Sequence, residues 1–204
     1  MHPNKAFRQT STEDNLAFAR QRSFGVLTLA GKKGPLASHI PFVLSDDGAT
    51  FGAHLVRSNP ILAMIEDPQP ALMVVSGADA YISPDWYAME NQVPTWNYIA
   101  VHLRGTLMRL PDAALRPHLR ALSARFERCL EKPEWTLDKM DSEPLEKMES
   151  FIAPVEFCVD SVAGTWKLGQ NKPEPARLGA AQGLEGSSLG SGIDEIARRM
   201  RESQ

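Results

Sequence analysis

The sequence predicts a mainly β protein in which an antiparallel barrel carries helices on its outside. Five or six strand candidates follow one another along the 204 residues, separated by turns rich in Gly, Asp and Ser. The strands and helices do not alternate in the way that builds a parallel sheet. With 43% hydrophobic and 23% charged residues, the composition is that of a globular domain.

The N-terminal quarter predicts one helix followed by three strands. Capping residues at 11–14 precede the apolar side of a short helix. Strands are predicted over residues 24–29 and 36–44, because a turn of Gly and Lys separates these apolar segments. The hairpin pattern at 45–48 then leads into a strand over residues 49–54.

The middle of the chain predicts two helices around three strands. A helix is expected over residues 60–67, because proline is favoured in a first helical turn. Two short strands follow, over 71–76 and 78–83, with Gly77 between them. A long strand is expected over 95–110, and apolar residues at 3–4 spacing predict a helix over 112–130.

The C-terminal part predicts a last strand, a flexible hinge and a basic helix. Apolar and polar residues alternate over 155–162, as in a half-buried strand. Residues 183–192 are rich in Gly and Ser, and a helix with three arginines follows over 193–201. We therefore expect a main domain, 1–184, and a tail, 185–204, made of the hinge and the helix.

Charge and composition exclude several classes of protein. The formal net charge is -3, with Lys+Arg 22 and Asp+Glu 25, so no basic surplus indicates a nucleic-acid binder. Cys129 and Cys158 form no CxxC pair, and His39, His54 and His102 stand alone, so no metal site is predicted. Without a signal peptide or an apolar run of about 20 residues, we expect a cytoplasmic protein that does not enter the membrane.

A first polar cluster, residues 54–60, lies where a predicted strand enters a predicted helix. Backbone N–H groups at a helix N-terminus bind anions, and an arginine such as Arg57 can hold a phosphate through two donors. The alternative is plain helix capping by Ser58 with a solvated Arg57.

Two further clusters combine aromatic and polar side chains. Residues 80–98 are dense in Tyr and Trp, which suits a planar heterocyclic ligand or a subunit interface, or else core packing around a hairpin. Residues 164–173 offer Lys167, Gln170 and Asn171 as donors to a phosphate or to ring carbonyls. The alternative for this segment is a turn with exposed polar residues.

Together, these clusters resemble the PaiB family of FMN-binding negative transcriptional regulators. The resemblance extends over about residues 7–184 and rests on the order and spacing of its motifs. These motifs are SHIPF (38–42), HLVRSNP (54–60), AYISPDWY (80–87), VPTWNY (93–98), VH (101–102) and KLGQN (167–171). The chain departs from the family in a shorter segment between Tyr87 and Val93, and in Gly169, where serine is typical.

The resemblance implies a split β-barrel of the pyridoxamine-phosphate-oxidase type, a homodimer, and FMN at the dimer interface. It implies these cofactor-binding residues: Ser38, His39, Ile40 and Pro41 along the isoalloxazine ring; Arg57, Ser58 and Asn59 at the phosphate, with His54 beside them; Thr95, Trp96, Asn97 and Tyr98 from the partner subunit; and Lys167, Gln170 and Asn171 closing the site.

The first functional hypothesis is an FMN-binding regulatory protein that acts through its ligand. The second is a flavin-dependent reductase or oxidase on the same fold, in which the cofactor carries the chemistry. No residue stands out as an acid or base, so no catalytic residue is predicted. A third is an FMN-free interaction module with an aromatic dimer interface. Direct DNA binding is doubtful, because neither a basic surplus nor a helix suited to a DNA groove is present.

Overall fold

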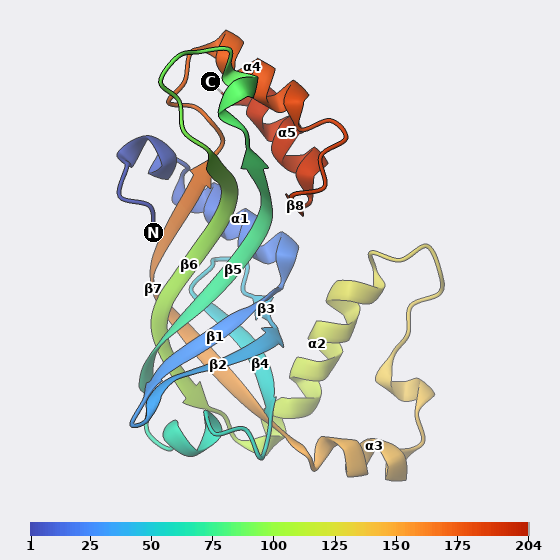
Figure 1. The fold of residues 1–204 in the computed structure, drawn as a ribbon. Helices are drawn as coiled ribbons and strands as arrows, with labels where there is room; N and C mark the ends of the chain where they lie inside the picture. Colours follow the sequence, from blue (N-terminus) through green and yellow to red (C-terminus); the bar gives the residue numbers. More distant parts are fainter. Residues whose placement is uncertain (204) are drawn as a thin grey trace. The chain divides into compact units, whose positions relative to one another are not determined.

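An antiparallel sheet of eight strands forms the centre of the fold, and helices flank it (Figure 1). In this computed structural model, which describes residues 1–203, the strand order is β2-β1-β5-β6-β7-β4-β3, and β8 pairs with β5. The strands are β1 (Phe24–Gly31), β2 (Gly34–Pro41), β3 (Val43–Leu44), β4 (Thr50–Val56), β5 (Gln69–Ile82), β6 (Thr95–Arg109), β7 (Ile152–Lys167) and β8 (Gly190–Ser191). The predicted class, mainly β with flanking helices, is confirmed.

The helices are α1 (Thr12–Arg22), α2 (Leu115–Glu127), α3 (Ser142–Glu149), α4 (Glu174–Gly183) and α5 (Ile193–Glu202). Contacts between residues divide the chain into two units. The central unit comprises residues 16–75 and 103–162, and the terminal unit comprises residues 1–15, 76–102 and the stretch from Ala163 onward. Strands β5, β6 and β7 each contribute residues to both units.

The core of the central unit is built around stacked phenylalanines. The ring centroids of Phe51 and Phe157 lie 4.6 Å apart, and those of Phe42 and Phe51 lie 4.9 Å apart. Buried and half-buried residues alternate along β4, as expected for a strand with one face in the core. At Gly105 on β6, a Cβ atom would lie 1.8 Å from the carbonyl oxygen of Cys158, so only glycine permits this close approach to β7.

The core of the terminal unit forms where α4 packs against α5 (Figure 1). The buried guanidinium of Arg177 on α4 donates to the carbonyl oxygen of Met200, one of the orphan acceptors at the end of α5. The buried indole Nε1 of Trp166 donates to Asn15 Oδ1 at 2.8 Å. Gly164 leaves room for this bond, because a Cβ there would lie 1.9 Å from the same oxygen.

The helix predicted over residues 60–67 is wrong, because this segment contains only a 3-10 turn, Leu62–Met64. The side chain of Asn59 accepts from the backbone N–H of Ile61 at 3.0 Å, whereas Ser58, the predicted capping residue, is exposed and caps no helix. Strand β5 begins at Gln69, however, which leaves too few residues for the hydrogen bonds that offset the cost of starting a helix.

Several predicted strand boundaries also needed correction. The two strands expected over 71–76 and 78–83 form the single strand β5, because Gly77 adopts an extended conformation and continues it. The predicted strand 36–44 is divided into β2 and β3 at the buried Phe42. Strand β7 extends beyond the predicted strand 155–162 at both ends. Helices α3 and α4 have no counterpart among the predicted elements.

The C-terminal tail is bound to the rest of the terminal unit. The segment predicted as a hinge contains β8, and the N–H of Tyr81 donates to the carbonyl oxygen of Leu189 at 2.9 Å. Helix α5 buries Ile196, Ala197 and Met200. Among residues 1–203, no helix is both long enough and apolar enough to span a membrane.

Candidate functional site

Four of the predicted cofactor-binding residues lie next to one another on β2 in the central unit. The pairing of β2 with β1 places Ser38 opposite Leu27 and His39 opposite Val26. Ser38 and Pro41 are half-buried and Ile40 is a core residue. The exposed ring of His39 stacks on Phe24, with centroids 6.5 Å apart. Because side chains alternate along a strand, Ser38 and Ile40 share one face of β2, and His39 and Pro41 share the other.

Asn59 connects β2 to the segment that follows β4. Its Nδ2 donates to Ser38 Oγ at 3.1 Å, although the two residues are 21 positions apart in the sequence. Two of the predicted motifs, SHIPF and HLVRSNP, therefore meet within the central unit. A cavity of about 670 Å3 begins at Pro60, directly after Asn59, and its wall continues along the β1–β2 turn. That volume lies within the range of about 300–1,000 Å3 that is typical of cofactor and ligand sites.

Arg57, the predicted phosphate ligand, is oriented by two partners in the central unit. Its Nη2 donates to Asp112 Oδ2 at 2.8 Å and its Nε donates to the carbonyl oxygen of Ser150 at 2.9 Å. These bonds use two of the five N–H groups of a guanidinium. The side chain of Arg57 is 34% exposed, so the remaining N–H groups are open to a phosphate. The neighbouring Ser58 is exposed.

His54 makes a contact with a histidine that lies far away in the sequence. Its Nδ1 lies 3.1 Å from Nε2 of His118 on α2, and both rings are half-buried. Burial, and next the nearby His54, lower the pKa of His118 to about 4, and burial also lowers the pKa of His54. His118 lies between Leu115 and Leu122 on the apolar side of α2, so its position on that helix was the available sign.

The remaining predicted residues belong to the terminal unit, where several line one cavity of about 260 Å3. Thr95, Asn97, Lys167 and Asn171 contribute to its wall, and Lys167 Nζ donates to Thr95 Oγ1. Gln170 bonds within its own turn instead: Oε1 accepts from Leu168 N at 2.8 Å, and Nε2 donates to the carbonyl oxygen of Trp166 at 2.5 Å. Gln170 therefore shapes the turn that carries Lys167 and Asn171.

Asn97 is the most buried polar residue of this cavity, at 1% exposure. Its Nδ2 donates to Met200 Sδ at 3.3 Å, but its buried Oδ1 has no hydrogen-bond partner in residues 1–203. Burial, and next the charge of Lys172, lower the pKa of Lys167. Lys172 also lines the cavity; it follows the KLGQN motif directly, and the sequence analysis did not single it out.

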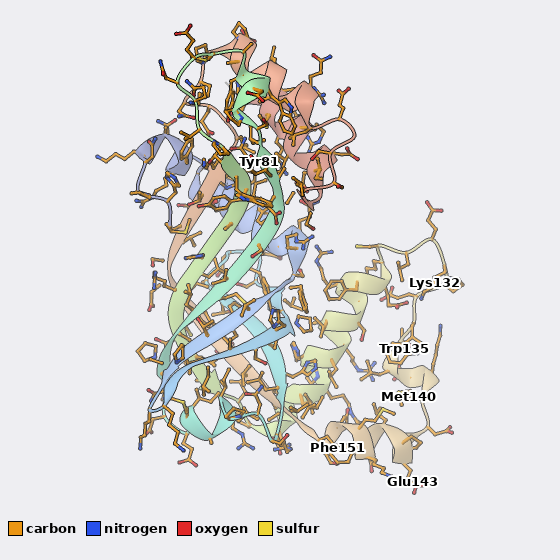
Figure 2. All side chains as sticks on the ribbon, viewed as in Figure 1. Tyr81, Lys132, Trp135, Met140, Glu143 and Phe151 are labelled. Carbon is orange, nitrogen blue, oxygen red and sulfur yellow. The ribbon has the colours of Figure 1, made fainter. Side chains whose placement is uncertain are left out.

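Trp96 and Tyr98 lie on β6 with Thr95 and Asn97, but they do not line the cavity. Trp96 is 48% exposed, and its ring meets Tyr81 edge to face, with centroids 6.1 Å apart. Figure 2 shows Tyr81 on strand β5. Tyr98 is half-buried. Trp96 and Tyr81 therefore form an aromatic pair on the surface of the terminal unit.

Comparison with known proteins identifies the family. Residues 1–161 match the family described as "Putative FMN-binding domain". The chain belongs to this FMN-binding family. It is also 31% identical over 188 residues to "Protease synthase and sporulation protein PAI 2" of Bacillus subtilis (strain 168), covering 91% of this chain and 89% of the relative. The resemblance to the PaiB family is confirmed, and so is FMN as the cofactor.

Solved structures of other flavoproteins share the fold of this FMN-binding family member. The flavocytochrome Anf3 from Azotobacter vinelandii is 14% identical, with a TM-score of 0.59 over 81% of this chain and 72% of its own. The FAD and heme binding protein from Mycobacterium smegmatis is 20% identical, with a TM-score of 0.57 over 79% of this chain and 73% of its own. The antiparallel sheet is therefore a fold used by flavin-binding proteins.

The central unit has polar donors suited to FMN, and the cavity of about 670 Å3 beside them is lined by other residues. Arg57 and Ser58 provide exposed donors, and Ser38 and Asn59 are already in contact beside them. When bound, FMN supplies a redox-active isoalloxazine ring, and the protein supplies its position and surroundings. The individual cofactor-binding residues remain predictions.

Proposed function

We propose that this protein holds FMN in a split β-barrel at a homodimer interface and acts as a regulator through its flavin ligand. The observation that carries the proposal is the 3.1 Å contact between Asn59 Nδ2 and Ser38 Oγ. It joins the motif expected at the phosphate to the motif expected at the isoalloxazine ring. This supports one continuous FMN site along β2 and the end of β4.

At the phosphate end, Arg57 supplies the charge. Hydrogen bonds between charged groups contribute about 1.5–3 kcal/mol each, roughly twice the value for neutral pairs. Asp112 and Ser150 hold two of its N–H groups, which reduces the entropy that the side chain would lose on binding a phosphate. The hydroxyl of Ser58 adds a neutral donor beside it.

In the proposed dimer, residues 95–98 of the partner subunit complete the site through the exposed Trp96, because Asn97 is buried within its own subunit. Exposed apolar side chains in the terminal unit support an interface there, since Val93 is 72% exposed and Trp96 lies beside it on the same segment. Exposed aromatic residues are enriched where subunits meet. The exposed Trp96, together with the half-buried Tyr81 that it meets edge to face, offers an aromatic surface to a second subunit.

The proposed regulator does not contact DNA directly. The arginines of α5 are each paired with a carboxylate at 2.6–2.9 Å: Arg198 with Glu202, Arg199 with Glu195 and Arg201 with Glu185. On α2, Arg116 and Arg120 are paired in the same way. Apart from Arg125, which donates to the backbone carbonyl oxygen of Arg20, these helices therefore present little uncompensated positive charge to phosphates. A gel-shift assay that showed preference for its own promoter over random duplex at physiological salt would contradict this.

The decisive experiment is a titration of the apoprotein with FMN, followed by the quenching of flavin fluorescence. We expect saturation at one FMN per subunit. Arg57→Ala should weaken binding about tenfold or more, because one charged hydrogen bond is lost. Arg104→Ala, which removes an exposed arginine of β6, is the matched control and should leave binding unchanged. An equal loss in both variants would reject the phosphate site.

Light scattering on the eluted protein tests the dimer. Trp96→Glu places a charge on the proposed interface and should shift the dimer toward monomer while weakening FMN binding. Met148→Glu makes the same change at an exposed apolar residue of α3 and should leave the mass unchanged. A monomeric wild-type protein that binds FMN fully would remove the interface from the proposal.

A steady-state assay separates regulation from catalysis. Consumption of NAD(P)H faster than about 1 per second, near the low end of ordinary enzyme turnover, would identify a flavin-dependent oxidoreductase instead. Slower consumption would support a protein in which FMN acts as a bound ligand.

A further inference from the structure

The cavity of the terminal unit concentrates positive charge without an acidic partner. Lys167 Nζ donates to Thr95 Oγ1 and Lys172 Nζ donates to Gln92 Oε1, and both acceptors are neutral. Within residues 1–203, neither lysine forms an ion pair. Two ammonium groups on one cavity wall repel each other, so the cavity favours a negative ligand.

Aromatic rings hold both ammonium groups in place. Lys167 Nζ lies 5.8 Å from the ring centroid of Phe7, and Lys172 Nζ lies 5.1 Å from that of Tyr87. Both rings are buried, so their positions are set by the core. A ring face attracts a cation but carries no net charge, and it therefore leaves the two positive charges uncompensated.

Asn97 places a second requirement on the ligand of this cavity. Its buried Oδ1 is an acceptor that finds no donor in the part of the chain described, and it belongs to the same cavity. Buried polar atoms are nearly always hydrogen-bonded in folded proteins. A ligand that brought an O–H or N–H group to this atom would satisfy it.

The volume limits the size of the ligand. About 260 Å3 is below the range of about 300–1,000 Å3 that accommodates drug-sized molecules. A small compound with one anionic group and one donor matches these dimensions, whereas a peptide or an oligonucleotide does not.

We infer that this cavity binds a small organic anion that also carries a hydroxyl or N–H donor. The anionic group lies between Lys167 and Lys172, and the donor meets Asn97 Oδ1. That this anion acts together with FMN rests on the proposed function; the need for charge and donor rests on the terminal unit alone.

Calorimetry on the FMN-loaded protein tests the two requirements with three matched probes. The anion 4-hydroxybenzoate has both groups, benzoate lacks the donor, and 4-hydroxybenzyl alcohol lacks the charge. We expect saturable binding of 4-hydroxybenzoate, binding of benzoate several-fold weaker, and binding of the alcohol at least tenfold weaker. Equal binding of all three, or no binding of any at 10 mM, would overturn the inference.

Variants locate the binding. Lys172→Gln should weaken 4-hydroxybenzoate about tenfold, while Lys147→Gln, at an exposed lysine of α3, should not change it. Asn97→Leu, if its melting temperature shows that it folds, should remove the preference for 4-hydroxybenzoate over benzoate. Unchanged binding in Lys172→Gln would place the probe elsewhere and overturn the inference, whether or not Asn97→Leu folds.

The anion could also be the phosphate of FMN itself, and a comparison of FMN with riboflavin separates the two sources. If Lys172→Gln abolishes the advantage of FMN over riboflavin and Arg57→Ala does not, the lysines hold the flavin phosphate and the second ligand is rejected. A protein that binds 4-hydroxybenzoate but not FMN would reject the proposed function and leave the anion site standing.

Discussion

The candidate sites of the central and terminal units differ in how their polar side chains are paired. In the central unit, the polar residues of the predicted site have partners within the unit: His54 meets His118, Arg57 meets Asp112, and Asn59 meets Ser38. In the terminal unit, two lysines share a cavity without a counter-charge, and a buried amide oxygen has no donor within residues 1–203.

This difference separates self-sufficient from ligand-dependent structure. The stability of a unit whose polar groups are paired internally depends on its packing and on the protonation of its own side chains. A unit with uncompensated charge gains stability when a matching ligand binds the folded form only. The following predictions test this contrast, from the largest expected effect to the smallest.

Gly105→Ala, in the central unit, should reduce the free energy of unfolding more than any other change. The new Cβ would lie 1.8 Å from the carbonyl oxygen of Cys158, which is backbone and cannot rotate away. We expect the free energy of unfolding to fall by about 3 kcal/mol, the upper end for overpacking. Gly52→Ala, whose Cβ would lie 3.1 Å from the side chain of His118, should cost less. Equal costs in urea unfolding would contradict this account.

Acid should destabilise the central unit through His118. Its pKa in the folded protein, about 4, lies below the ordinary histidine value of about 6.5, so the unfolded chain binds more protons between these values. Stability present above pH 6.5 is therefore lost as the pH falls to 4, by roughly 2–3 kcal/mol at 1.36 kcal/mol per pKa unit. In urea unfolding at pH 7, 5.5 and 4.5, His118→Phe should lose most of this slope, with a remainder from the half-buried His54, whereas a replacement of the exposed His39 by Gln should keep it.

Gly164→Ala should destabilise the terminal unit by about 2 kcal/mol, the cost of breaking a buried hydrogen bond. The new Cβ would lie 1.9 Å from Asn15 Oδ1, which accepts from Trp166 at 2.8 Å. The effect is smaller than for Gly105 because a side chain can rotate. In the background of Asn15→Ala, the Gly164→Ala change should cost much less, and additive costs in the double-mutant cycle would contradict the clash.

Asp112→Asn should give the smallest change in stability. The direction of its effect on FMN affinity shows what Asp112 does to Arg57. Removing the carboxylate beside Arg57 leaves more positive charge for the FMN phosphate, so FMN should bind a few-fold more tightly. Stability should change by less than about 1 kcal/mol, as for other exposed ion pairs. A fluorescence titration that showed weaker FMN binding would mean that Asp112 positions Arg57 more than it competes for it.

Local patterns predicted much of the fold. The long strand expected over 95–110 is β6, and the basic helix expected over 193–201 is α5, because hydrophobic alternation and helical spacing both act over a few residues. The helix over 60–67 failed because the start of β5 limits its length, which no local pattern reveals. Helices α3 and α4 were missed because both are short, and α4 in addition owes its stability to the residues that it buries.

The sequence by itself determined the mainly β class, the family and the cofactor, because turn residues act locally and the spaced motifs are family-specific. Only the tertiary structure decided which polar groups pair and which stay open. It brings His54 to His118 across 64 positions and Arg57 to Asp112 across 55, and it buries Asn97 beside Met200 across 103. The physical reason is that chain packing, and not spacing along the sequence, sets which buried groups find partners and which await a ligand.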